Sequence, residues 1–450
     1  MSATLHLQRP QRPILAQIRP PGSKSLSNRA LLLAAMATGR TRIEGCLDAE
    51  DTQVMLDCLA RLGVEVERTG EAIAEGLELE GSPGLGTHGG PIELHVGTAG
   101  TVARFLTAAL AGVRAPSWES VRVDGTERMR ERPMDTLLGA LEQLGASLEG
   151  HGQPGALPVS IRAGAGLAGG QVVLDRPASS QFISALLIAG CLAAQPIEII
   201  LRQGTPARPY VDMTLATIAA FGGNAYWAEG GADGSERLIV EPAALRPCPL
   251  FVVEPDASAA SYLLALPAIW GGQVTIPELG TASLQGDAQF CRVLERFGAS
   301  VEQTGEQTTV RGPVPGSGPG QARLRGQQLD LTDMPDMTLT AAVVALFCEG
   351  PTRITGVEIL RHHESDRIAA GATELRKLGA QVNELTDGLE ITPPAAGPRA
   401  GVAIDTYRDH RMAMAFAMVG DVSINDPACV DKTFPRYFEV LASLGLGVSS

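Results

Sequence analysis

The 450-residue sequence contains few aromatic residues, since phenylalanine, tryptophan and tyrosine together make up only 4% of it. Its core must therefore be built from alanine, valine, leucine and isoleucine. Long hydrophobic runs are also missing. The longest candidate is interrupted by Gln195 and Pro196, and no stretch reaches the ~18 apolar residues of a membrane-spanning helix. The N-terminal stretch lacks the apolar segment of a signal peptide, so we expect no membrane partner.

An excess of positive charge is absent as well. The 36 lysines and arginines are outnumbered by 50 aspartates and glutamates, which gives a formal net charge of −14. This balance argues against a nucleic-acid partner, because such partners select basic surfaces.

Paired cysteines are missing too, because the seven cysteines are scattered without a Cys-x-x-Cys pair. This pattern predicts free thiols in a reducing cytoplasm rather than a disulfide framework. His362, His363, Glu364 and Asp366 lie close together, but their spacing matches no zinc motif. We therefore expect neither a metal nor a cofactor.

Glycine, by contrast, is abundant and part of it is periodic. The pattern Leu-x-x-Leu/Phe-Gly, with isoleucine once replacing the first leucine, occurs six times and ends at Gly63, Gly145, Gly222, Gly298, Gly379 and Gly445. Each glycine closes an amphipathic stretch and precedes an alternating one. This order predicts a helix that ends at a left-handed glycine, followed by a half-buried strand.

Between these stretches lie six compact apolar segments rich in small residues, each with the composition of a helix buried on all sides. The repeating unit is therefore strand, buried helix, strand, amphipathic helix, strand, over roughly 75 residues. Six units favour an α/β (α+β) fold of two domains with three units each, and the chain is expected to cross between them near the strand at 250–255. A single solenoid and a doubly wound sheet are the alternatives.

Cationic side chains recur at the predicted N-termini of helices, where the helix dipole disfavours positive charge by ~0.3–1 kcal/mol. Such repeated placement predicts bound anions. Two domains facing each other would form a cationic cleft for small, multiply anionic substrates. Asp336 and Glu364 fall among these cations, which favour ionised carboxylates suited to general-base catalysis.

Eight segments of the sequence, in order, resemble the 5-enolpyruvylshikimate-3-phosphate synthases of the enolpyruvyl transferase family. They are PGSKSLSNRALLLAAMATG from Pro21, GTAGTVARF from Gly97, RMRERPM from Arg128, ASSQF from Ala178, MPDMT from Met334, HESDR from His363, DHRMAMAF from Asp409 and KTFPRYF from Lys432. The resemblance implies two domains, each with three βαβαββ units about a pseudo-three-fold axis (an inverse α/β barrel). It also implies an N-terminal domain over residues 23–252 and a C-terminal domain over residues 1–22 and 253–450.

The resemblance further implies transfer of the enolpyruvyl group of phosphoenolpyruvate to the 5-hydroxyl of shikimate 3-phosphate, in the route to chorismate and the aromatic amino acids. It implies that shikimate 3-phosphate is held by Lys24, Ser25, Arg29, Ser179, Ser180, Gln181, Tyr210, Asp336 and His363. It implies that phosphoenolpyruvate is held by Lys24, Gly100, Arg128, Gln181, Arg367, Arg411 and Lys432. Asp336 is then the proton acceptor, and Glu364 with Lys24 exchanges the proton of the methylene carbon.

Three positions depart from the family's common pattern. His363 replaces a usual lysine, Ala207 a serine found in some members, and Thr98 an asparagine found in many. These departures concern the binding of shikimate 3-phosphate. We expect His363 to act as a titratable cation, so that substrate affinity weakens as pH rises through about 6.5 to 7.5.

Other readings of the same residues remain open. One is a carboxyvinyl transferase with a different acceptor, and the related enzyme acting on UDP-N-acetylglucosamine typically uses a loop cysteine that is missing near Arg128. Another is a non-catalytic anion-binding paralogue, although Lys24, Asp336 and Glu364 are all present. The family expectation is a cytoplasmic monomer.

Overall fold

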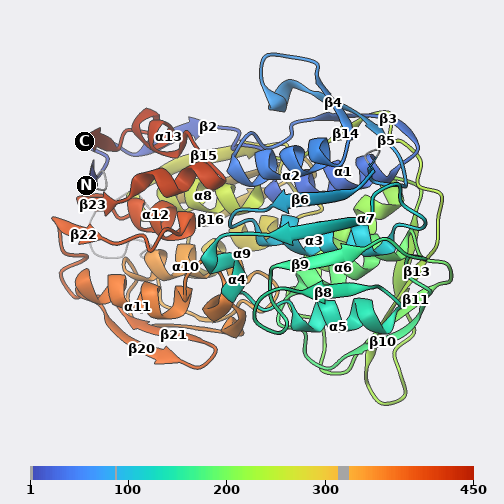
Figure 1. Cartoon of the computed structure of the whole chain (residues 1–450). Helices are drawn as coiled ribbons and strands as arrows, with labels where there is room; N and C mark the ends of the chain where they lie inside the picture. The colour runs from blue at the N-terminus through green and yellow to red at the C-terminus, as the bar shows by residue number, and fades with distance from the viewer. Residues whose placement is uncertain (1–3, 87–88, 313–323, 450) are drawn as a thin grey trace. The chain divides into compact units, whose positions relative to one another are not determined.

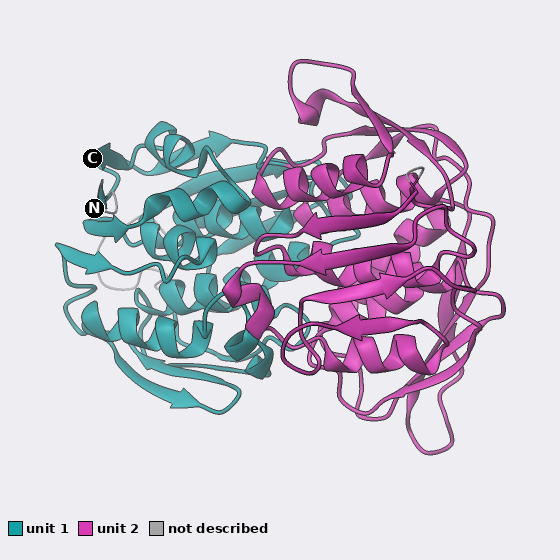
Figure 2. Ribbon diagram, in the orientation of Figure 1, with its two compact units in different colours: residues 1–21, 254–450 teal, residues 22–253 magenta. Residues whose placement is uncertain are grey.

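The computed structural model describes residues 4–86, 89–312 and 324–449. The chain divides into two compact units, which Figure 2 shows in different colours. Unit 2 comprises residues 22–253, and unit 1 comprises residues 1–21 together with 254–450. Each unit has its own core of buried apolar side chains.

Unit 2 contains three four-stranded sheets (Figure 1). In spatial order, the first is β14 (Phe251–Val252), β3 (Gly39–Glu44), β5 (Leu77–Gly81) and β4 (Glu65–Arg68). The second is β6 (Pro91–His95), β7 (Ser120–Asp124), β9 (Val159–Arg162) and β8 (Leu148–Gly150). The third is β10 (Gly170–Leu174), β11 (Ile197–Leu201), β13 (Glu236–Glu241) and β12 (Asn224–Ala228).

Unit 1 repeats this arrangement with three further sheets. The first is β16 (Ser300–Gln303), β17 (Gln307–Gly312), β15 (Gly272–Pro277) and β2 (Ile14–Gln17). The second is β18 (Gln328–Asp330), β19 (Thr352–Thr355), β21 (Gly388–Thr392) and β20 (Gln381–Leu385). The third is β22 (Val402–Ile404), β23 (Val422–Asn425), β1 (Thr4–Gln8) and β24 (Gly447–Ser449).

All six sheets share one topology: a parallel pair extended by two antiparallel strands. In three sheets a strand comes from a remote part of the chain, and in one of them β1 pairs with β23 and β24. β2 precedes the first helix of unit 2 but pairs in parallel with β15 of unit 1, and β14 pairs in parallel with β3. The chain therefore crosses between the units after β2 and again after β14.

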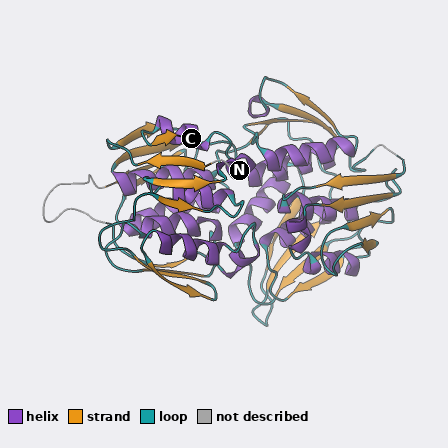
Figure 3. Ribbon diagram, turned by 60° about the vertical axis from the view of Figure 1, so that its left-hand side comes forward, coloured by secondary structure: helices purple, strands orange, loops and turns teal. Residues whose placement is uncertain are grey.

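The apolar segments form the inner helices of each unit. They are α1 (Lys24–Met36), α3 (Gly100–Gly112), α6 (Ser180–Gly190), α8 (Ala257–Trp270), α10 (Thr338–Ala345) and α12 (His410–Ala417). Almost every residue of these helices is buried, and Figure 3 shows strands toward the outside of each unit and helices toward its interior. A helix covered on all sides needs apolar residues all round, as the composition predicted.

The amphipathic stretches form the second helix of each repeat. They are α2 (Glu50–Arg61), α5 (Asp135–Gln143), α7 (Arg208–Ala220), α9 (Phe290–Phe297), α11 (Arg367–Lys377) and α13 (Tyr437–Ser443). The six predicted glycines follow these helices, and all have positive φ, from 74° at Gly222 to 117° at Gly298. Glycine adopts this region without a Cβ penalty, so the predicted helix ends are confirmed. The predicted fold class is confirmed too.

None of the helices in the described residues is long and apolar enough to cross a membrane. All seven cysteines are described and free, as predicted, and five of them are buried. Burial raises the pKa of Cys46, Cys58, Cys191, Cys348 and Cys429 to about 12 and that of Cys291 to about 11.

Alkylation of the native protein at pH 8 is expected to begin at Cys248. This thiol is only half-buried, whereas a thiol with a pKa near 12 is ionised to about one part in ten thousand at pH 8, and the thiolate is the reactive form. Mass spectrometry after brief treatment with iodoacetamide measures the order of labelling. Labelling of all seven thiols in urea is the control, and faster labelling of Cys46 or Cys191 than of Cys248 in the native protein would contradict the prediction.

Candidate active site

In unit 2, a lysine and an aspartate meet where α1 begins. Ser23 caps the helix, because its Oγ accepts a hydrogen bond from the Leu26 backbone amide. Lys24 is the first helical residue, and its Nζ lies 3.1 Å from Oδ2 of Asp51 in the first turn of α2. The Asp51 side chain is 4% exposed and that of Lys24 is 16% exposed. Lys24 is therefore held in place while part of its surface stays accessible.

One turn further along α1, Arg29 is buried among neutral oxygen atoms. Its Nε donates to Thr214 Oγ1 (2.7 Å), and its Nη2 donates to Ser184 Oγ (3.2 Å). Backbone carbonyls accept the remaining contacts, at Ser25 (2.9 Å) and Tyr210 (3.0 Å). The guanidinium also lies 5.1 Å from the centre of the Phe105 ring.

No acidic side chain of the described residues pairs with Arg29. Burial lowers the pKa of this guanidinium to about 10, an effect that the nearby Tyr210 only partly opposes. Taking a cation out of water is costly unless an anion compensates for it. The Arg29 site is therefore chemically suited to a bound anion.

The N-termini of α6 and α3 contribute further polar groups. Ser179 caps α6 by accepting a hydrogen bond from the Gln181 amide, and Ser180 is the first residue of that helix. Gln181 Oε1 accepts a hydrogen bond from Arg104, whose guanidinium lies 5.0 Å from the centre of the Phe182 ring. These contacts fix the orientation of the Gln181 amide.

Gly100 opens α3 against an arginine side chain. A Cβ at this position would lie 2.6 Å from Nη1 of Arg132, so the absence of a side chain allows the guanidinium to approach the helix end. Arg132 also donates to the backbone carbonyl of Thr98 (3.3 Å). The side chain of Thr98, one of the three departures, takes no part in this contact.

The predicted ligand Arg128 differs from its neighbours. It lies in the short helix α4 (Glu127–Glu131), is 43% exposed and pairs with Glu131 at 2.8 Å. Arg104 and Arg132, by contrast, are 3% and 6% exposed. Ala207, another departure, precedes α7 in the left-handed region (φ 46°, ψ 54°) and gives that helix no side-chain cap.

In unit 1, Arg367 is the centre of a charged cluster. It begins α11, its side chain is 2% exposed, and it contacts three carboxylates. Its Nε and Nη2 donate to Asp409 at 2.7 and 3.2 Å, Nη2 also donates to Glu364 (2.7 Å), and Nη1 donates to Asp336 (2.9 Å). Asp409 itself is fully buried and accepts further hydrogen bonds from Ser365 Oγ and the Arg411 amide.

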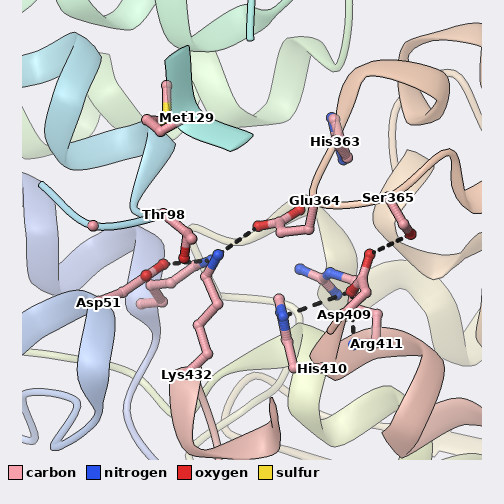
Figure 4. A network of polar contacts seen from close by, with 12 residues as sticks. Asp51, Thr98, Met129, His363, Glu364, Ser365, Asp409, His410, Arg411 and Lys432 are labelled. Atoms are coloured by element: carbon pink, nitrogen blue, oxygen red, sulfur yellow. Dashed lines mark hydrogen bonds and ion pairs between the residues drawn. The ribbon is translucent and has the colours of Figure 1, made fainter. Parts of the chain in front are cut away.

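Both predicted catalytic carboxylates of this cluster lie between two cations. Asp336 accepts hydrogen bonds from Arg367 and from Nη2 of Arg411 at 2.7 Å. Glu364 accepts hydrogen bonds from Arg367 and from Nζ of Lys432 at 3.0 Å. Figure 4 shows the Lys432–Glu364 and Ser365–Asp409 contacts. Burial alone would lower the pKa of Arg367, but Asp409, Glu364 and Asp336 together raise it well above its usual value, so Arg367 stays cationic.

His363 lies beside the same arginine. Its Nδ1 is 2.9 Å from Arg367 Nη1 and 3.7 Å from Asp336 Oδ1. A guanidinium only donates hydrogen bonds, so Nδ1 can bond to Arg367 only as an acceptor, in the neutral ring. A protonated ring would instead pair with Asp336, so the cationic role expected of His363 stays a prediction.

The cluster can bind anions and move protons. Three cations and three carboxylates balance in charge, and an anionic ligand that took over Arg411 or Lys432 would release Asp336 or Glu364 for proton transfer. No group of three or more histidine, cysteine, aspartate or glutamate residues in the described part of the chain could hold a metal ion. The groups in place suit acid–base and electrostatic catalysis.

Several polar residues of these sites were not predicted as site residues. Asp51, Ser184, Thr214 and Asp409 each hold a predicted cation in place. Asp409 lies two residues before the predicted Arg411, in the position of a helix cap. Ser184 and Thr214 lie within helical stretches, and their spacing in the sequence gave no sign that they contact Arg29.

Comparison with known proteins places these features in context. The sequence matches the family described as EPSP synthase (3-phosphoshikimate 1-carboxyvinyltransferase) over residues 8–441. The chloroplastic 3-phosphoshikimate 1-carboxyvinyltransferase of Brassica napus is 44% identical over 444 residues, covering 97% of this chain and 84% of the relative. The 3-phosphoshikimate 1-carboxyvinyltransferase of Cellvibrio japonicus is 42% identical over 432 residues, covering 95% and 96%.

Solved structures show the same architecture. The EPSP synthase from Acinetobacter baumannii has a TM-score of 0.76 at 25% identity and covers 99% of this chain and 100% of its own. The enolpyruvyl transferase NikO from Streptomyces tendae has a TM-score of 0.77 at 17% identity, with coverage of 100% and 99%. At 17% identity, the similarity to NikO is evidence for the fold alone.

Proposed function

Because this chain belongs to the EPSP synthase (3-phosphoshikimate 1-carboxyvinyltransferase) family, we propose that it transfers the enolpyruvyl group of phosphoenolpyruvate to the 5-hydroxyl of shikimate 3-phosphate and releases phosphate. The observation that carries the proposal is the pair Asp336 and Glu364, each held between two cations. The reaction needs a base for a hydroxyl, an acid for a methylene carbon, and cations for a phosphate and a carboxylate.

The shikimate 3-phosphate ligands are assigned mainly to unit 2. The proposed ligands are Lys24, Ser25, Arg29, Ser179, Ser180, Gln181 and Tyr210, with Asp336 and His363 from unit 1. The uncompensated burial of Arg29 supports a dianionic ligand there. The assignment of Tyr210 concerns its phenol, whereas its backbone carbonyl already accepts a hydrogen bond from Arg29.

The phosphoenolpyruvate ligands are assigned to Lys24, Gly100, Arg128, Gln181, Arg367, Arg411 and Lys432. Arginine suits both the carboxylate and the phosphate, because its planar donors can bind two oxygens at once. Arg128 is 43% exposed, and it would exchange its surface pair with Glu131 for the substrate. No cofactor or metal is assigned a role.

The proposed mechanism has two stages. Asp336 takes the proton of the 5-hydroxyl as its oxygen attacks C2 of phosphoenolpyruvate, while Glu364, together with Lys24, delivers a proton to C3. The resulting tetrahedral species carries the phosphate. The same pair then removes a proton from C3, the C–O bond to phosphate breaks and the enol ether double bond forms. Fixed cations stabilise the charge that develops in both stages.

A phosphate-release assay on the full chain tests the function. Phosphoenolpyruvate with shikimate 3-phosphate is expected to release phosphate and to give a product with vinyl protons in its NMR spectrum. Omitting shikimate 3-phosphate should stop the release, and so should replacing it by UDP-N-acetylglucosamine. Release with another acceptor only would favour a different carboxyvinyl transferase, and no release with any acceptor would favour the non-catalytic alternative.

We expect the affinity for shikimate 3-phosphate to fall as pH rises through about 6.5 to 7.5. His363 Nδ1 lies 2.9 Å from Arg367 Nη1 and accepts a hydrogen bond from it when the ring is neutral, so a dianionic ligand that favours the charged ring would bind together with a proton. Binding that takes up a proton weakens as protons become scarcer. Titration calorimetry at pH 6, 7 and 8 measures the effect, with His363→Lys as the control whose affinity stays level. If the affinity of the unaltered protein stayed level from pH 6 to pH 8, the prediction would be refuted.

The free cysteines support a reducing compartment, and we propose a cytoplasmic monomer. Size-exclusion chromatography with light scattering tests the oligomeric state.

A further inference from the structure

The segment that leads into α12 has an unusual backbone. Tyr407 and Arg408 are consecutive residues with positive φ values of 55° and 57°. This left-handed region is uncommon for residues other than glycine, asparagine and aspartate. Residues held there persist only where their surroundings fix them. The contacts of the neighbouring side chains show what holds this segment.

The first attachment of the segment is to the last turns of α11. Tyr407 Oη donates to Glu374 Oε1 at 2.8 Å, and the Asp405 backbone amide donates to Glu374 Oε2 at 3.2 Å. The Glu374 side chain is fully buried and pairs with Lys377 at 2.9 Å. Lys377 in turn pairs with Asp405 at 2.7 Å. One buried carboxylate thus holds the segment on both sides of Thr406.

The second attachment is to the beginning of the same helix. Asp409, two residues after Tyr407, binds Arg367 through both of its oxygens. Arg367 and Glu374 are seven residues apart, so they lie on one face of α11 about two turns from each other. The segment therefore lies along this face and is fastened to it at both ends. Of the two strained residues, Tyr407 makes the first attachment and Arg408 lies between it and Asp409.

We propose that Tyr407 and Glu374 are positioning residues, which fix Asp409 and thereby the orientation of Arg367. The inference rests on the proposed function, which assigns Arg367 to phosphoenolpyruvate. Neither Tyr407 nor Glu374 needs to touch a substrate for this role. Without the Tyr407–Glu374 hydrogen bond, fewer contacts hold Tyr407 and Arg408 in the left-handed conformation. Asp409 can then move with the segment.

Tyr407 is a suitable position for a test substitution. The residue is 43% exposed, so replacement by phenylalanine leaves no cavity in the core. Burial and the neighbouring Glu374 raise the pKa of its phenol to about 12, so the hydroxyl is a donor at every pH at which the enzyme would be assayed. Tyr226 offers a matched control in unit 2, because its hydroxyl contacts Glu241 at 3.3 Å and Tyr226→Phe makes the same chemical change.

Hydrogen exchange of arginine Nε–H groups in the ¹⁵N-labelled full chain tests the inference directly. The Nε–H of Arg367 is expected to exchange about five- to ten-fold faster in Tyr407→Phe, the effect of one lost hydrogen bond. The Nε–H of Arg29, which donates to Thr214, should be unchanged and serves as the internal reference. Tyr226→Phe should alter neither signal.

Steady-state kinetics provide the second readout. Tyr407→Phe is expected to raise KM for phosphoenolpyruvate by about the same five- to ten-fold, while KM for shikimate 3-phosphate changes by less than about two-fold. Unchanged Arg367 exchange, or equal rises in both KM values, would overturn the inference. If the unaltered protein released no phosphate, the proposed function would fail, but the exchange of Arg367 would still report on the positioning role.

Discussion

Replacing Asp336 by asparagine is expected to lower kcat for phosphate release by about 10² to 10⁴-fold, the usual contribution of a general base. The amide keeps the shape of the side chain but cannot take a proton from the 5-hydroxyl. It also presents an NH₂ group to Arg367 or Arg411, each of which now donates to one oxygen of Asp336. The rate of phosphate release at saturating substrates measures the effect.

Asp330→Asn is the matched control for this prediction. Asp330 is an exposed carboxylate of β18 in the same unit, and its contacts are local, with the amide and hydroxyl of Thr332. Its replacement should leave kcat within about two-fold, as is usual for substitutions away from a site. Retention of more than a tenth of the activity by Asp336→Asn would remove this carboxylate from the role of base. An unchanged melting temperature would show that loss of activity is not loss of fold.

Replacing Asp409 by alanine is expected to destabilise unit 1 by about 3–5 kcal/mol, the cost of removing one member of a buried ion pair. Asp409 is fully buried, and Arg367 would keep only two of its three carboxylate partners. The cap of α12 would be lost as well, because Asp409 accepts a hydrogen bond from the Arg411 amide. Urea unfolding with 5-fluorotryptophan and ¹⁹F NMR measures the change, since Trp270 reports unit 1 through its contacts with Met418 and Phe347.

Asp405→Ala provides the comparison for Asp409→Ala. The Asp405 side chain is 54% exposed and pairs with Lys377, which is 34% exposed. Pairs of this kind contribute about 0–1 kcal/mol. If the two variants unfolded at the same urea concentration, the buried Asp409–Arg367 pair would contribute no more to the stability of unit 1 than the exposed Asp405–Lys377 pair.

Repetition is what made the fold predictable. The motif ending at Gly63 and its five counterparts specify a helix end wherever they occur, because a left-handed C-terminal residue is a local requirement. The buried helices could be predicted for a similar reason, since α6 and α10 show their burial in their own composition. The crossing near residues 250–255 was expected, but the pairings of β14 with β3 and of β2 with β15 have no such local signal. Both are short strands whose partners are decided by long-range pairing.

The candidate site also contains residues that the sequence predicts and residues that it does not. Lys24, Arg367 and Arg411 were found because cations at helix N-termini conflict with the helix dipole, and the sequence alone displays that conflict. The burial of Arg29 could not be found this way, because its partner Thr214 is 185 residues away in the sequence. The contact between His363 and Arg367 was also out of reach, since spacing alone does not specify it.

The pairing of β1 with β23 and β24 has a consequence for the order in which the protein is made. Asn425 in β23 follows its partner Thr4 by 421 residues, and at about 5–20 residues per second a ribosome needs roughly 20 to 80 seconds to synthesise that interval. Unit 2 is continuous in sequence and can fold during this time. β2 stays unpaired only until β15 emerges shortly after unit 2. β1 must wait for β23 and β24 near the C-terminus, so we expect nascent chains to expose β1 to chaperones long after unit 2 is complete.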